Sequence, residues 1–101
     1  MPRCGRLDMD TWRFISQLIR KTVENVLNDP RYNVPRSYWE TYHNFGKRVW
    51  GIMRHGGGQE EINNAIKYYQ DKYGADPNIL GIIADRLMPI LSAWLAKLPH
   101  C

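Results

Sequence analysis

Histidine, cysteine and carboxylate side chains, which carry most protein chemistry, are few and scattered in this chain of 101 residues. His43, His55 and His100 show neither the HExxH spacing nor another spacing typical of metal ligands. Cys4 and Cys101 lie near opposite ends of the chain, and two cysteines do not predict a disulfide framework. A bridge between the chain ends stays open, because an even-numbered helical bundle brings its termini to one end. We therefore expect no metal site and no cofactor.

The carboxylates lie mostly where helices are expected to begin or where the chain turns, which gives them structural roles. These residues are Asp10, Asp29, Glu40, Glu60, Glu61 and Asp76. Catalysis requires a reactive group held beside a second group that tunes it, and acid–base chemistry at His43 is the one alternative. The glycines at 56–58 lack the Gly-Lys-Ser/Thr ending of a phosphate-binding loop and predict a turn. The sequence thus predicts no catalytic residues and a protein that is not an enzyme.

Basic side chains are concentrated in the first half of the chain. The net charge is +4, and residues 1–55 hold ten Lys/Arg against five Asp/Glu, whereas residues 56–101 hold four against five. An excess of this kind indicates an anionic partner, although ordinary surface charge is the alternative. Lys and Arg on helix faces address phosphates and not base edges, so we expect duplex DNA binding without sequence preference. The predicted nucleic-acid-binding residues are Arg3, Arg6, Arg13, Arg20, Lys21, Lys47, Arg48 and Arg54.

Four amphipathic helices and no strand account for the hydrophobic pattern. The first is expected over residues 11–28 with Asp10 as its cap. The second, ending near Arg54, begins at a predicted capping box of Ser37 and Glu40. The third runs over residues 59–73 and ends at Gly74, which can adopt the left-handed conformation that closes a helix.

The fourth helix is expected to begin at Pro77, after an Asp76 cap, and to kink or break near Met88 because Pro89 follows. No apolar stretch reaches the roughly 18 residues of a spanning helix, and the polar N-terminus does not resemble a signal peptide, so an intracellular protein is expected. Four such helices with short connections predict an all-α four-helix bundle over residues 11–101, preceded by a short basic N-terminal arm at residues 1–10.

Large aromatic side chains are more numerous than a core of this size needs, which indicates a surface for other subunits. The predicted subunit-interface residues are Trp39, Tyr42, Trp50, Tyr68, Tyr73 and Trp94. The tyrosines at 68, 69 and 73 can also stack unpaired bases, although a tyrosine row at helical spacing is typical of packing as well. A small basic helical transcriptional regulator is the alternative function. Its helix-turn-helix would need a shorter link than the proline-containing one between the first two helices.

Part of the chain resembles the major coat proteins of rod-shaped and filamentous viruses of archaea, the rudiviruses and lipothrixviruses. The resemblance covers roughly residues 32–88. Its features are Asn33-Val34-Pro35, Phe45-Gly46, Arg54 before a glycine-containing turn, Tyr68-Tyr69, Tyr73-Gly74-Ala75-Asp76-Pro77 and Ile79-Leu80. The tyrosine–glycine–proline corner is the most specific of these.

The resemblance implies a four-helix coat subunit that packages linear double-stranded DNA in a helical nucleoprotein within a virion, after assembly in the host cytoplasm. In the family that DNA is A-form and is enclosed by paired subunits. Enveloped members use two related coat proteins, so the implied partners are DNA, further copies of this chain and a paralogous coat protein. The apolar C-terminal segment around LMPILSAWLAKL would then face a partner subunit or a lipid envelope, with burial in the bundle as the alternative.

Overall fold

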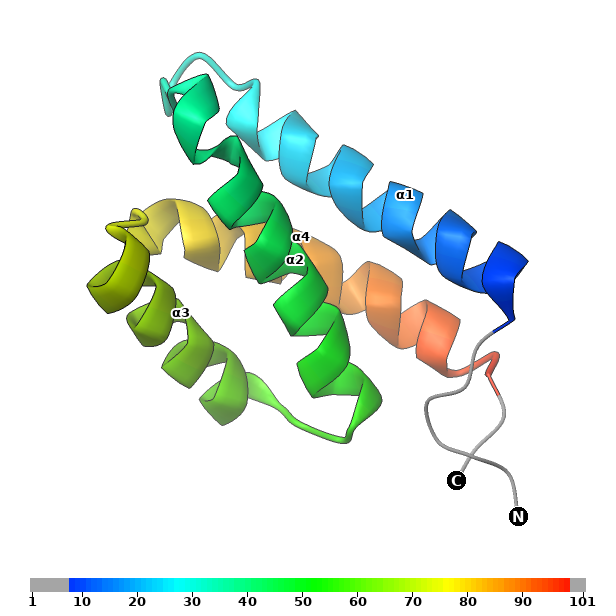
Figure 1. Cartoon of the computed structure of the whole chain (residues 1–101). Helices are drawn as coiled ribbons and strands as arrows, with labels where there is room; N and C mark the ends of the chain where they lie inside the picture. Colours follow the sequence, from blue (N-terminus) through cyan, green and yellow to red (C-terminus); the bar gives the residue numbers. More distant parts are fainter. Residues whose placement is uncertain (1–7, 99–101) are drawn as a thin grey trace.

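The computed structural model describes residues 8–98, and these residues form an all-α bundle of four helices (Figure 1), as the sequence predicts. The helices are α1 (Met9–Leu27), α2 (Trp39–Arg54), α3 (Gln59–Tyr73) and α4 (Pro77–Leu95). A short 3₁₀ turn, η1 (Arg36–Tyr38), precedes α2. Arg3, Arg6 and the two cysteines lie outside the described residues.

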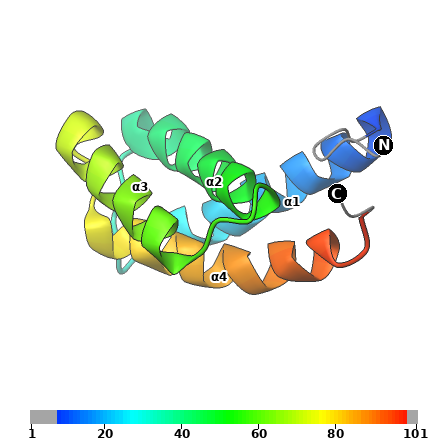
Figure 2. The ribbon, with the colours of Figure 1, turned by 90° about the horizontal axis from the view of Figure 1, so that it is seen from below.

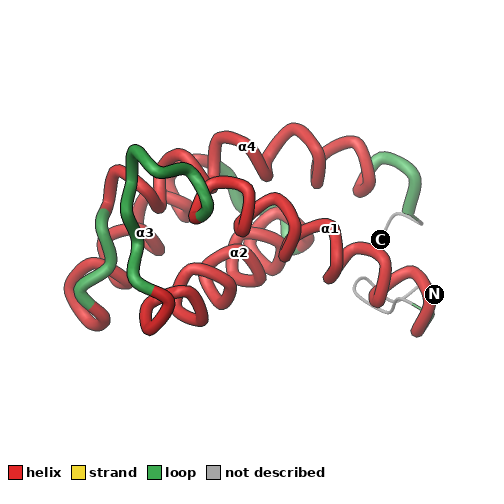
Figure 3. Tube along the Cα trace, turned by 90° about the horizontal axis from the view of Figure 1, so that it is seen from above, coloured by secondary structure: helices red, strands yellow, loops and turns green. Residues whose placement is uncertain are grey.

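The four helices do not overlap along their whole length. α1 and α4 lie side by side (Figures 1 and 2), while α2 and α3 cover only the half of this pair that is nearer to the α3–α4 corner. The first half of α1 and the second half of α4 therefore extend beyond the other two helices, which Figure 3 also shows. The fold is elongated as a result, with extents of 45 × 26 × 19 Å.

The hydrophobic core lies where all four helices meet. Ile15, Ile19, Phe45, Ile62 and Leu87 are fully buried there. α2 and α4 each contact all three of the other helices. Six apolar residues of α4 are buried, whereas Asp85, Arg86 and Pro89 lie on its exposed face.

The first helix begins at Met9, and its cap is Asp8 instead of the predicted Asp10. An Asp8 carboxylate oxygen accepts the Thr11 backbone N–H at 2.7 Å, and its other oxygen accepts the Thr11 hydroxyl at 3.0 Å. Asp10 lies in the first turn, where a negative charge favours the helix dipole. The boundary between the arm and the bundle therefore lies before Met9 and not after residue 10.

The predicted capping box of Ser37 and Glu40 does not form. Residues 36–38 instead make the 3₁₀ turn, which runs directly into α2 without a side-chain cap. The Trp39 indole N–H donates to the Val34 carbonyl at 3.2 Å. This bond lies across the start of the helix and fixes the entry of the chain. The backbone N–H groups of Tyr38 and Trp39 donate to the Pro35 and Arg36 carbonyls within the 3₁₀ turn, so they do not need a hydroxyl cap.

The α3–α4 corner has the predicted chemistry. Gly74 ends α3 with a φ of 69°, and the Asp76 side chain accepts the Asn78 backbone N–H at 2.8 Å at the start of α4. The corner is also tied to α2, because the Tyr42 hydroxyl accepts the Asp76 backbone N–H at 2.9 Å.

Pro89 does not break α4, so this alternative of the predicted kink or break is wrong. The helix continues through it to Leu95, and Pro89 lies on the exposed face. The expectation that no segment is long and apolar enough to span a membrane is also wrong, because α4 is, by length and composition alone. Six of its residues nevertheless lie in the core, and a helix that contributes to a protein core can have the same length and composition.

Candidate nucleic-acid interface

Two of the predicted basic residues meet in a hollow between α1 and α2. Arg20 of α1 and Lys47 of α2 line it together with Arg36 from the 3₁₀ turn, and its volume is about 380 Å³. The two helices can approach closely here because position 46 is a glycine. A Cβ on Gly46 would lie only 2.8 Å from Ile19 Cγ2 and 2.9 Å from Val23 Cγ2.

Three cations and two carboxylates line the α1–α2 hollow. Glu24 is occupied by Arg20, whose Nε lies 3.3 Å from Glu24 Oε2. Arg36 stacks on the Trp39 ring at 4.3 Å from guanidinium carbon to ring centroid, which fixes a cation at the mouth of the hollow. Within residues 8–98, neither Arg36 nor Lys47 has a carboxylate within 4.0 Å. These two charges are free to meet an anion.

His43 lies beneath these cations and is mostly buried. Its Nε2 lies 3.2 Å from Glu24 Oε2 but makes no hydrogen bond of good geometry within the described part of the chain. Burial lowers the pKa of His43, Arg20 lowers it further, and Glu24 opposes both. The imidazole is therefore neutral at neutral pH, because its ordinary pKa is already about 6.5.

The remaining predicted basic residues of α1 and α2 do not join this hollow. Arg13 and Lys21 are exposed on α1, while the Arg54 guanidinium lies over the Trp50 ring at 5.7 Å. α1 and α2 diverge from the loop that joins them (Figure 1). Arg13, in the first half of α1, and Arg54, at the end of α2, are thus carried apart.

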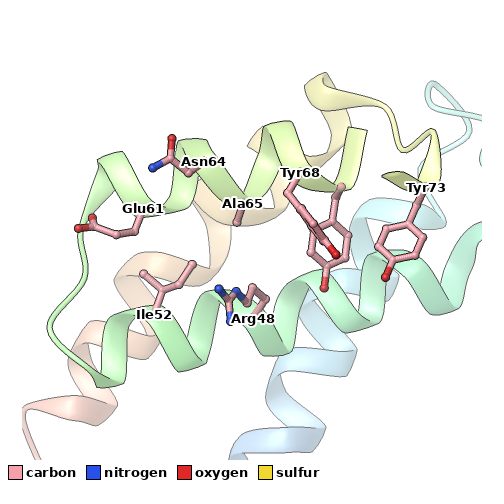
Figure 4. A pocket seen from close by; sticks show the side chains of 8 residues that line it. Arg48, Ile52, Glu61, Asn64, Ala65, Tyr68 and Tyr73 are labelled. Atoms are coloured by element: carbon pink, nitrogen blue, oxygen red, sulfur yellow. The ribbon is translucent and has the colours of Figure 1, made fainter. Parts of the chain in front are cut away.

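Arg48 lies on a different surface from Lys47. It lines a groove of about 620 Å³ between α2 and α3, together with Tyr68 and Tyr73 (Figure 4). Neighbouring helix positions point about 100° apart, so Lys47 can face α1 while Arg48 faces α3. Of the predicted basic residues, Arg20 and Lys47 thus lie at the α1–α2 hollow, and Arg48 lies at a separate groove.

The structure divides the predicted subunit-interface residues into exposed and buried ones. Tyr68 and Tyr73 are 51% and 44% exposed, and Trp39 and Trp94 are half-buried. Tyr42 and Trp50 are each only 3% exposed. Their assignment to a subunit interface is corrected, because both rings are part of the core of the subunit itself.

Three residues important to these surfaces were missed by sequence reasoning. Arg36 precedes Trp39 by three positions, a spacing that allows stacking. Phe14 is 51% exposed and its ring lies 5.1 Å from that of Trp94 on α4; Met9 is 70% exposed. The exposure of Phe14 could have been predicted, because this residue lies outside the apolar stripe of its helix.

No group of three metal-ligating side chains occurs in residues 8–98. No protein-family model matches the chain, and no curated protein and no solved structure matches it either. The interpretation of the two basic surfaces therefore depends on their own chemistry.

Proposed function

We propose that the chain is a structural coat protein, which binds linear double-stranded DNA without sequence preference and packages it into the helical nucleoprotein of a virion. The observation that carries this proposal is the convergence of Arg20, Arg36 and Lys47 on one hollow between α1 and α2. The sequence resemblance of residues 32–88 supplies the biological setting.

The arrangement suits phosphates better than base edges. The cations come from two helices and a turn, and they surround a concave surface, whereas a reader of the major groove presents one protruding helix. Residues 28–38 separate α1 from α2, a link longer than the three- or four-residue turn of helix-turn-helix proteins. These features favour packaging over the sequence-reading regulator.

A competition experiment tests the absence of sequence preference. Unrelated duplexes of equal length should displace one another equally, and binding should weaken steeply with salt, by a slope of about −0.9 in log K against log salt for each phosphate neutralised. A hundredfold preference for one sequence would instead establish a regulator.

A paired substitution tests the surface itself. The Arg20→Ala/Lys47→Ala variant should lose duplex affinity about equally for all sequences and lower the salt slope by about two. Lys67→Ala/Arg86→Ala, on exposed faces of α3 and α4, removes the same charge elsewhere and serves as the control. Equal losses in the two variants would show that net charge, and not the α1–α2 hollow, governs binding.

The proposed partners are DNA, further copies of the chain and a paralogous coat protein. The extension formed by α1 and α4 presents apolar side chains, including Phe14 and Trp94, which suits contact with a neighbouring subunit. Contact of the C-terminal segment with a lipid envelope belongs to the same proposal. Leu87 and Leu91 in that segment are buried in the bundle, so only the outward-facing side chains of the segment can contact lipid.

A further inference from the structure

The groove between α2 and α3 combines aromatic walls with a free cation. Tyr68 and Tyr73 project from α3 toward α2, and Arg48 projects into the same space from α2 (Figure 4). Its volume of about 620 Å³ lies within the usual range for small-molecule sites, about 300–1,000 Å³. The groove is separate from the α1–α2 hollow, since the two share no lining residue.

The aromatic wall is held in place from below. The Tyr69 ring packs edge-on against the buried Phe45 ring at 5.4 Å between centroids. Tyr68 and Tyr73 then pack against Tyr69 at 5.9 Å and 5.2 Å. The two exposed rings are therefore ordered by a third ring that is itself anchored in the core, so a planar ligand would meet a preformed surface.

The charges of the groove favour an anion at the tyrosine end. In the described residues Arg48 has no carboxylate within 4.0 Å. Lys72 does not line the groove, but it lies next to the tyrosine end, where it donates to the Tyr68 hydroxyl at 2.9 Å and lies over both exposed rings. Glu61 lies at the other end, where its carboxylate accepts the Gly58 backbone N–H at 2.9 Å and caps α3.

We infer that the α2–α3 groove binds a single nucleotide unit, with its base stacked on Tyr68 or Tyr73 and its phosphate on Arg48. Base–aromatic stacking and a nearby guanidinium are the two elements of single-strand recognition. Asn64, an exposed amide that also lines the groove, can add hydrogen bonds to a base edge. Paired bases in a duplex are stacked on one another and cannot enter, so the ligand is a free mononucleotide or an unpaired nucleotide within a strand.

Titration of the full chain with two probes tests this inference and distinguishes the two sources. The probes are thymidine monophosphate and a thymidine oligonucleotide of about eight residues, within the length that one single-strand site covers. Both should perturb the ring resonances of Tyr68 and Tyr73 in NMR spectra. Saturation by the mononucleotide alone indicates a free ligand, whereas binding of only the oligonucleotide indicates a strand.

The variants Arg48→Ala and Tyr73→Ala should each weaken oligonucleotide binding by about tenfold, the loss expected for one stacked base or one charge-assisted contact. Arg86→Ala is the charge-matched control and should leave oligonucleotide binding nearly unchanged. The substituted side chains are exposed, and circular dichroism would verify that each variant folds. The inference is overturned if Arg86→Ala costs as much as Arg48→Ala, or if neither tyrosine resonance moves at saturation.

This inference does not depend on the packaging function. Arg20→Ala/Lys47→Ala should weaken duplex binding and spare the oligonucleotide, while Tyr73→Ala should do the reverse. Duplex binding without oligonucleotide binding would remove the groove site and leave the packaging proposal intact. Oligonucleotide binding without duplex binding would support the groove site and contradict the packaging proposal.

Discussion

His43 couples the charge of the α1–α2 hollow to pH, because its imidazole lies among Arg20, Glu24 and Lys47. Its pKa is lowered by burial and by the neighbouring cations, so protonation occurs only below the ordinary histidine range. Protonation of His43 adds a positive charge to the α1–α2 hollow, the surface that we propose binds DNA. Duplex affinity should therefore rise only as the pH falls below the ordinary histidine value of about 6.5, because the lowered pKa keeps the imidazole neutral above it.

The stability of the free protein should change in the opposite direction. The unfolded chain binds the His43 proton more tightly than the folded chain, so this contribution to stability is complete above the unfolded pKa and is lost as the pH falls through the folded one. Fluorescence anisotropy and thermal unfolding at several pH values would measure the two trends. His43→Gln should remove the contribution of His43 to the pH dependence of both duplex affinity and stability. If the variant keeps the same pH profiles, another group is responsible for them.

The Tyr42 hydroxyl is a second residue with a sharply defined role, because it joins α2 to the corner before α4. It accepts the Asp76 backbone N–H at 2.9 Å. Tyr42→Phe keeps the ring and leaves this donor unpaired, so it should lower the free energy of unfolding by about 1–2 kcal/mol. Tyr38→Phe, at a ring that is 44% exposed, is the matched control and should change little. Urea unfolding of both variants tests the difference.

At the scale of the helices, the two glycines of α2 have different roles. A Cβ on Gly46 would lie within 3 Å of Ile19 and Val23, whereas a Cβ on Gly51 would meet nothing within 4 Å. Gly46→Ala should destabilise the fold by about 1–3 kcal/mol through overpacking. Gly51→Ala should stabilise it by up to about 1 kcal/mol through helix propensity alone. Thermal unfolding that shifts both variants in one direction would contradict this assignment.

The four helices could be predicted from the sequence. A helix boundary could be predicted only where the residue at that boundary has a single structural role open to it. Gly74 and Asp76 set the α3–α4 corner correctly because left-handed closure and capping are local properties. The start of α2 was predicted wrongly because Ser37 lies inside a 3₁₀ turn, whose own backbone hydrogen bonds satisfy the N–H groups of Tyr38 and Trp39. Pro89 is tolerated within α4 on its exposed face, and exposure at one position depends on tertiary packing.

The candidate site depends more strongly on the whole molecule. The composition and spacing predicted the basic residues, but they could not show that Lys47 and Arg48 face different neighbours. That outcome depends on α2 being placed between α1 and α3. Tyr42 and Trp50 were assigned to a subunit interface for the same reason. An aromatic residue on the apolar stripe of a helix is a core residue or an interface residue according to what covers it.

At the scale of the molecule, the apolar end formed by α1 and α4 should determine assembly on DNA. Phe14 is 51% exposed against Trp94, in the part of the bundle that α2 and α3 do not cover. Subunits bound along one long polyanion have a high effective concentration, so a weak contact at this end suffices for cooperative coating. We expect electron microscopy of the protein with long linear duplex, alone or with a paralogous coat protein, to show regular filaments.

Substitution of Phe14 distinguishes assembly from DNA binding. Phe14→Ala should reduce cooperativity on long duplex by removing contact area between neighbours, and it should leave affinity for a duplex that holds one subunit unchanged, because Phe14 does not line the α1–α2 hollow. Tyr38→Ala removes a comparably exposed ring beside η1 and is the control. Equal effects of the two variants would show that this end is not the contact between subunits. Discrete one-to-one complexes at saturating protein, with and without the paralogous protein, would contradict the coat function itself, because packaging requires neighbouring subunits to meet.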